Sequence, residues 1–243
     1  MSRLGAAQLL QVWEQGLDRE PAARALVMLA AAVPGTDPSE LAFWPLGRRD
    51  AALLRWRTEL FGPDLEALLQ CPGCGGDVEL TFPAAMLEGE TPIDAGQPDG
   101  QLAVLRGGYS LTLRAVTSAD LLALLSPDPE AELVRRCVTS ATAGGTSVEP
   151  AALPVDVLDT LGAELAAADP AATTDLAVEC PDCGHAWLAP FHIAGYLWAE
   201  LHHWAGRMLL DIHALAGAYG WSEADILALP PRRRQAYLEL VAP

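Results

Sequence analysis

Four of the five cysteines fall in two short and nearly identical segments, Cys71-Pro72-Gly73-Cys74-Gly75 and Cys180-Pro181-Asp182-Cys183-Gly184. In each segment two thiols stand two residues apart on a tight turn, where both can point at one metal ion, and the glycine leaves room for amide hydrogen bonds to sulfur. Two such C-P-x-C-G knuckles supply the four thiolates of a structural zinc site. The sequence therefore predicts that Cys71, Cys74, Cys180 and Cys183 bind Zn²⁺, with a redox pair or two separate dithiols as the alternatives.

The two knuckles are more than a hundred residues apart, whereas ordinary zinc ribbons place them about 15–20 residues apart. We therefore expect one small ribbon that is interrupted by an inserted subdomain and closed by the metal. Four thiolates leave no coordination position for water, so the zinc should be structural and not catalytic. His185 directly follows the second knuckle. It could replace a cysteine as a ligand, but packing beside the site is the favoured interpretation.

Other chemistry finds little support in the residue patterns. His202, His203 and His213 lie near Glu200 and Asp211, but no H-E-x-x-H pattern joins them, and adjacent histidines point to different faces of a helix. The sequence also lacks a P-loop, a G-x-G-x-x-G and a G-x-S-x-G segment. We expect neither an enzyme nor a small-molecule substrate.

Charge and composition limit the kind of partner. The chain of 243 residues carries a formal net charge of −17, and all of its basic residues are Arg. Phosphate backbones would repel such a protein, so nucleic-acid binding, the commonest role of a zinc ribbon, is disfavoured, while basic protein surfaces remain suitable partners. The apolar stretches are too short for a membrane span, and the N-terminus does not read as a signal peptide. Cytoplasmic localisation is expected, with Cys137 a buried free thiol.

The segments around the knuckles predict helices and short strands. Apolar residues recur at helical spacing through the first sixty residues, and the expected helices cover 4–17, 18–32, a brief segment at 38–46, and 48–61. Polar and apolar residues alternate after the first knuckle and before the second. The expected strands are 77–82, 174–179 and 185–190. Each knuckle is then followed by a strand, as a ribbon requires.

The segment between the two halves of the ribbon predicts a small acidic α+β unit. It holds 13 acidic residues against four Arg. Gly107-Gly108 is a two-residue turn signal and predicts a hairpin of strands 101–106 and 109–115. The other expected elements are a loop at 88–100, helices at 121–125, 129–139 and 155–168, and a mobile connection at 140–154.

The last fifty residues predict one long helix and two short ones. An apolar stripe recurs in steps of three and four up to Tyr219, and Gly220 should end the helix. Ser222 is positioned to cap a short helix, and Pro231 should begin the last one. The predicted fold is α+β and mainly α, divided into an N-terminal helical region (1–66), the first ribbon half (67–82), an inserted subdomain (83–173), the second ribbon half (174–191) and a C-terminal helical region (192–243).

Two segments of this tail carry a resemblance to a known family. They are Phe191-His192-Ile193-x-x-x-Leu197-Trp198-x-Glu200 and the run from Ala218-Tyr219-Gly220-Trp221-Ser222 through Leu229-Pro230 and Arg232-Arg233 to Tyr237. Together they resemble small tail proteins of contractile-tailed phages and of phage-tail-like contractile injection systems. The chain is similar to the baseplate family typified by a baseplate hub subunit of the T-even phages, and its knuckles match the injection-system members. The second segment also echoes tail assembly chaperones.

The resemblance implies a non-enzymatic baseplate component that assembles into a phage-tail-like particle through contacts with other baseplate or tail proteins. A tail or baseplate assembly chaperone that is not retained in the particle, and a zinc-ribbon nucleic-acid-binding protein, are the alternatives. Aromatic residues and Arg are the usual anchors of interfaces. The expected partner-binding residues are Trp198, Trp204, Trp221, Arg232, Arg233, Arg234 and Tyr237, with burial in the core as the competing explanation for each Trp.

Overall fold

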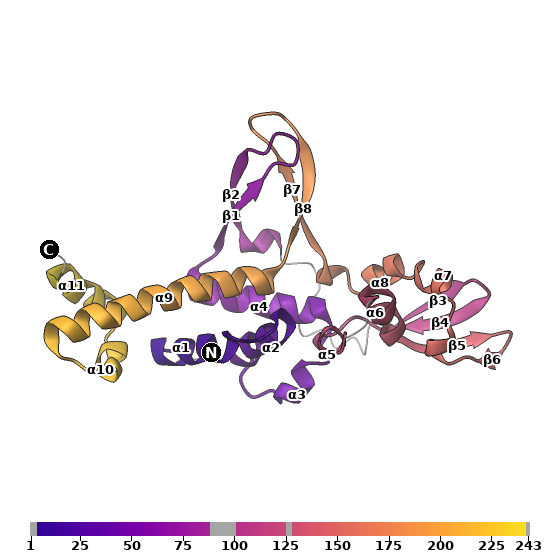
Figure 1. Cartoon of the computed structure of the whole chain (residues 1–243), viewed down its shortest axis with the longest axis horizontal. Coiled ribbons are helices and arrows are strands. Elements are labelled where there is room, and N and C mark those ends of the chain that lie inside the picture. Colours follow the sequence, from indigo (N-terminus) through magenta and orange to yellow (C-terminus); the bar gives the residue numbers. More distant parts are fainter. Residues whose placement is uncertain (1–3, 88–100, 125–127, 242–243) are drawn as a thin grey trace.

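The computed structural model describes residues 4–87, 101–124 and 128–241 (Figure 1). It has the predicted mainly helical α+β fold. Helices form an elongated body, two β-hairpins project from the body as an arm, and a small α+β lobe lies at the end of the body opposite the C-terminus (Figure 1). The arm consists of residues 64–83 and 174–191, and the lobe of the described part of 101–172.

The body is built from the four N-terminal helices and one long helix. Its helices are α1 (Ala6–Gly16), α2 (Pro21–Ala32), α3 (Pro38–Leu41), α4 (Leu46–Phe61) and α9 (Ile193–Tyr219). Met28, Leu53 and Leu197 are fully buried where α2, α4 and α9 meet. The helix expected from residue 18 begins instead at Pro21, because the fixed φ of proline suits the first helical position. The brief helix expected at 38–46 ends at Leu41, and Leu46 already belongs to α4.

The arm contains two antiparallel hairpins of matching design. The strands are β1 (Asp64–Gln70) with β2 (Asp77–Pro83), and β7 (Thr174–Glu179) with β8 (Ala186–Phe191). Gln70 pairs with Asp77 and Glu179 pairs with Ala186, so each knuckle fills the turn of one hairpin. Val78, Val178 and Ala189 are buried between the two sheets. Strand β1 was not predicted, whereas the three predicted strands of the ribbon are confirmed within one residue at either end.

The lobe has a four-stranded antiparallel sheet in sequence order. Its strands are β3 (Leu102–Arg106), β4 (Tyr109–Leu113), β5 (Val138–Ala143) and β6 (Thr146–Ser147). Arg106 pairs with Tyr109, which confirms the predicted hairpin. The mobile connection expected at 140–154 is wrong, because β5 pairs along β4 and turns through Gly144 and Gly145 into β6. Both glycines have positive φ, which favours glycine in such a turn.

Short helices cover the lobe and connect it to the body. They are η1 (Ala84–Met86), α5 (Ser118–Leu122), α6 (Pro129–Cys137), η2 (Pro150–Ala152), α7 (Val155–Leu158), α8 (Gly162–Ala168) and η3 (Pro170–Ala172). The single helix expected at 155–168 is in fact two helices. Leu158 and Leu161, on either side of the break, are both fully buried in the core of the lobe. The loop expected at 88–100 lies outside the described residues.

The C-terminal helices α10 (Glu223–Ala228) and α11 (Pro231–Val241) fold back onto the far end of α9 (Figure 1). Gly220 ends α9 with a φ of 69°, as predicted. Ser222 caps α10 in a reciprocal capping box with Asp225, in which each side chain bonds the other residue's backbone N–H. Among the described residues, no helix has both the length and the apolar character that crossing a membrane requires.

Candidate metal centre

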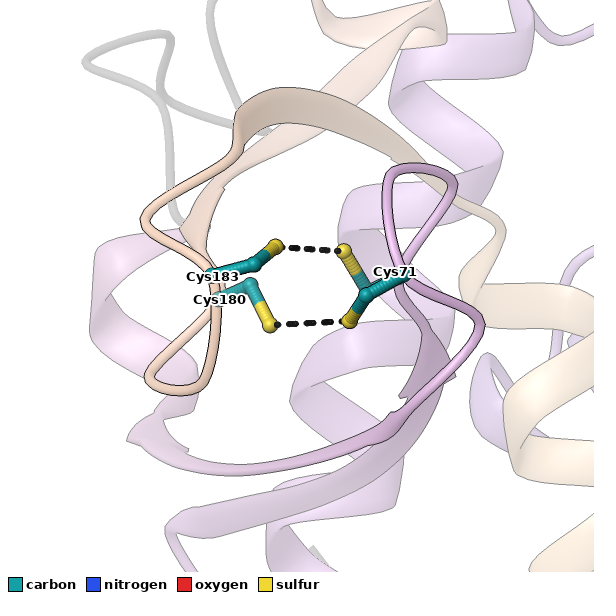
Figure 2. Close-up of side chains that lie close together, drawn as sticks. Cys71, Cys180 and Cys183 are labelled. Carbon is teal, nitrogen blue, oxygen red and sulfur yellow. Dashed lines mark hydrogen bonds between the residues drawn. The ribbon is translucent and has the colours of Figure 1, made fainter.

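The four knuckle cysteines meet at the tip of the arm. Their sulfur atoms all lie within 4.8 Å of one another. Cys71 Sγ is 3.7 Å from Cys183 Sγ, and Cys74 Sγ is 3.7 Å from Cys180 Sγ. Figure 2 shows the side chains of Cys180 and Cys183 turned toward those of the first knuckle, with each dashed line joining sulfurs of different hairpins. The fold thus gathers the four cysteines that the sequence singled out.

Both knuckles are held by the same backbone hydrogen bonds. In the first, the N–H of Cys71 donates to the carbonyl of Gly76, and the N–H of Gly75 donates to the carbonyl of Cys71, each at 2.8 Å. In the second, Cys180 donates to His185 and Gly184 donates to Cys180, each at 2.9 Å. Gly75 and Gly184 have φ values of 75° and 71°, a region that side chains disfavour. The recurring glycine of the C-P-x-C-G motif is therefore required by the turn.

The arrangement of sulfurs fits a tetrahedral divalent ion. Zinc–sulfur bonds of about 2.3 Å in a tetrahedron place neighbouring sulfurs about 3.8 Å apart, close to the 3.7 Å of the two cross-hairpin pairs. Thiolates are the donors that structural zinc prefers. Cys71 and Cys180 are buried, while Cys74 and Cys183 face solvent. Each hairpin would thus contribute one inner and one outer ligand.

The electrostatics of the site are compatible with a bound cation. Burial opposes ionisation of Cys71, but the N–H groups of Cys74 and Gly73 bond its sulfur and help to lower its pKa to about 7. The N–H of His185 favours the thiolate of Cys183, yet burial and the three neighbouring sulfurs raise the pKa of Cys183 to about 12. Four thiolates at this separation repel one another unless a positive ion lies between them. All four cysteines could therefore be ionised together only around such an ion.

His185 and Trp187 flank the centre. Their rings stack at a centroid distance of 6.0 Å, and Trp187 packs against the buried cluster of the arm that includes Cys71 and Cys180. The side chain of His185 also packs against the first knuckle, since a Cβ added to Gly73 would lie 3.0 Å from it. The imidazole therefore packs against both hairpins. Packing beside the site, rather than metal binding, is the role that the sequence favoured for His185.

The tryptophans proposed as partner anchors on α9 lie largely within the body. Trp198 is half-buried against the main core, and the guanidinium of Arg24 lies 4.5 Å from the centre of its ring. Trp204 is half-buried where the main core meets a smaller cluster at α1 and α9. Both rings therefore contribute to the packing of the body, whatever their exposed edges contact.

The remaining predicted anchors gather at the C-terminal end. The ring of Trp221 stacks on Tyr219 at 4.6 Å and meets Tyr237 edge-on at 4.9 Å. Arg232 and Arg233 are exposed in the first turn of α11. Arg234 is buried instead, and its Nε lies 3.5 Å from the carboxylate of Asp211 on α9. The three arginines thus divide into two that face solvent and one that holds α11 to α9.

Comparison with known proteins gives one family. Residues 8–194 match the family model described as T4 bacteriophage base plate protein. A search of curated proteins and a search of solved structures gave no match. The matched segment contains the N-terminal helices, the arm and the lobe, and it stops two residues into α9. The resemblance drawn from the sequence rested mostly on the residues after that point. Because the match covers more than half of its residues, the chain belongs to the T4 bacteriophage base plate protein family.

Proposed function

We propose that the chain is a structural, non-catalytic subunit of a contractile injection system or phage-tail-like baseplate, and that a zinc ion closes its arm. The family match over residues 8–194 carries this proposal, since it includes the N-terminal helices of the body, the arm and the lobe. Within it we propose the five-part division expected from the sequence, with the ribbon halves at 67–82 and 174–191.

The proposed zinc is supported by the arm itself. Four sulfurs within 4.8 Å of one another can fill all four positions of a tetrahedral ion, so such an ion can hold the hairpins together but cannot present a water to a substrate. The hydrophobic cluster between the two sheets is small, with five buried residues that include Cys71 and Cys180. A metal would add the cross-link that so small a core needs.

The proposed partners are other baseplate or tail proteins. The net charge of −17 favours basic protein surfaces over phosphate backbones. The cluster of Trp221 and Tyr237, together with Arg232 and Arg233, which are exposed in the first turn of α11, offers one contact surface at the C-terminal helices.

The proposal is tested by mass spectrometry of purified contractile particles from the native host. A structural subunit should be present in fixed proportion to the other baseplate proteins. Absence from the particles, with abundant chain in the lysate, would favour an assembly chaperone. Salt-sensitive binding of the purified chain to DNA or RNA would instead support a nucleic-acid-binding role.

A further inference from the structure

Strand β8 is apolar on both of its faces. All six of its residues, Ala186 to Phe191, are apolar. Trp187, Ala189 and Phe191 turn inward and pack in the arm or against the body. Ala186, Leu188 and Pro190 turn outward and are exposed, with 66% of Leu188 accessible.

The cross-strand partners extend this outer surface onto β7. Leu188 lies opposite Ala177, while Ala186 lies opposite Glu179 and Pro190 opposite Asp175. We call this the β7–β8 outer face. Its members are Ala177, Ala186, Leu188 and Pro190, bordered at either end by Asp175 and Glu179.

Strands with one solvated face usually alternate apolar and polar residues, whereas apolar residues on both faces are typical of a strand that is covered on both sides. Strand β2 of the same arm follows the first pattern, since its outward residues are Asp77, Glu79 and Thr81. The two hairpins therefore differ. The β7–β8 outer face has the composition of a covered surface.

The charge of the arm indicates which kind of protein surface would cover the β7–β8 outer face. Its 38 residues hold seven acidic side chains and neither Arg nor Lys, whereas the body and the C-terminal helices together hold 11 Arg and 12 acidic residues. The arm is thus a local acidic projection on an otherwise nearly balanced body. Complementary charge guides encounter and favours a basic partner, while the like-charged arm of another copy would be repelled.

The mode of contact follows from Pro190. Proline has no backbone N–H and interrupts the hydrogen-bonding edge of a strand, so a partner strand could not pair continuously along β8. The contact would run instead through the side chains of the outer face, with Leu188 as its central apolar anchor.

We propose that the β7–β8 outer face docks against an apolar segment flanked by Lys or Arg on another protein of the baseplate. The inference rests on the proposed function for the identity of that neighbour. The surface and the chemistry of its partner follow from the arm.

A site-specific photo-crosslink tests the contact. The full chain, with a photo-crosslinking phenylalanine derivative at position 188, is expressed together with the other proteins of the tail gene cluster, and crosslinked peptides are identified by mass spectrometry. The matched control carries the same group at position 68. Leu68 is 65% exposed, on the outer face of the other hairpin. The expected product joins position 188 to an apolar peptide within a few residues of Lys or Arg.

A second comparison uses Leu188→Glu and Leu68→Glu, each competed against tagged wild-type chain during assembly. Loss of a central apolar anchor should reduce the share of Leu188→Glu in particles by about tenfold or more, while Leu68→Glu should enter normally. Equal melting temperatures and zinc contents would establish that both variants fold.

The outcomes separate this inference from the proposed function. If the chain enters particles but position 188 gives no product, gives an acidic peptide or gives another copy of this chain, the inference is overturned and the proposed function stands. If the chain is absent from particles yet position 188 crosslinks to a basic-flanked apolar peptide of another protein, the docking surface stands without the baseplate role. Equal entry of both Glu variants would also overturn the inference.

Discussion

Arg57 of α4 and Glu200 of α9 form a two-point ion pair across 143 residues of sequence, with N–O distances of 2.8 and 2.6 Å. The guanidinium is 3% exposed and also donates to the carbonyls of Gly62 and Asp64, where the chain leaves α4 and enters β1. Hydrogen bonding to Glu200 raises the pKa of Arg57, although burial opposes this. One side chain thus fixes two body helices and the base of the arm.

Replacing Arg57 should be costly because it leaves a partly buried carboxylate and two carbonyls without their donor. We expect Arg57→Ala to lower the free energy of unfolding by about 2–4 kcal/mol, measured by urea denaturation. Arg55→Ala, on the exposed side of the same helix, should change it by less than about 0.5 kcal/mol. Equal losses in the two variants would contradict the role assigned to the ion pair.

Removing one thiol should abolish metal binding and loosen the arm without unfolding the body. Cys74 is exposed, so Cys74→Ser changes the ligand set with little effect on packing. Zinc measured by plasma mass spectrometry should fall from about one ion per chain to nearly none. Hydrogen exchange should rise in both knuckles while the helical circular dichroism is retained, since the core of the body is formed by other residues.

The control for this experiment is Cys137→Ala in the lobe. Cys137 is fully buried away from the knuckles, and burial raises the pKa of its thiol to about 11. This variant should keep its zinc. A Cys74→Ser protein with undiminished zinc would refute the tetrathiolate site.

The buried carboxylate of Asp120 should make the lobe sensitive to acid. Burial raises its pKa, but two bonds from Arg114, at 2.6 and 2.7 Å, and one from the hydroxyl of Thr117 outweigh burial and lower the pKa overall. A lowered pKa stabilises the fold above the unfolded value of about 3.9, and the contribution disappears as pH falls through the folded value. Asp120→Asn should therefore cost about 2 kcal/mol at pH 7.

The difference in unfolding free energy between wild type and Asp120→Asn should shrink when urea titrations are repeated near pH 3. Asp159→Asn is a suitable control, because Asp159 is exposed on the same lobe. A gap that stays constant between the two pH values would show that the ionised form of Asp120 contributes nothing.

Substitutions at the three consecutive arginines of α11 should affect either the stability of the chain or its assembly, depending on the position. Arg234→Ala removes the contact with Asp211 and should lower stability by about 1 kcal/mol. Arg232→Glu with Arg233→Glu should leave the melting temperature unchanged, because both side chains are exposed, and should reduce entry into particles. Normal entry of the double variant would remove these two residues from the proposed interface.

Local patterns predicted the long helices of the body and the C-terminal helices, both knuckles and the Gly107-Gly108 hairpin, because each depends on residues that are close in sequence. Strand β1 was not predicted because its sequence, Asp64 to Gln70, has no β-branched residue and places two leucines side by side. Its conformation comes from pairing with β2. Pairing likewise explains β5: its residues 138–139 were expected to end a helix and its residues 140–143 to begin a mobile connection, but they pair with β4.

The candidate site was predictable to the extent that its ligands repeat a motif. The type and spacing of four residues were enough to predict that the cysteines come together in one site. The ion pair of Arg57 and Glu200 could not be found in this way, because nothing in either local sequence identifies a partner 143 residues away. Burial of Arg234 beside two exposed arginines is equally non-local, since it depends on how α11 lies against α9.

The split of the ribbon around the lobe sets an order of events during synthesis. The second knuckle leaves the ribosome only after more than a hundred further residues have followed the first. Until then the first knuckle can offer an ion two sulfurs, and closing so long a loop is entropically costly unless the intervening chain has already become compact. Tight metal binding would therefore require a folded lobe. A substitution that destabilises the core of the lobe should thus first be detected as weaker metal binding.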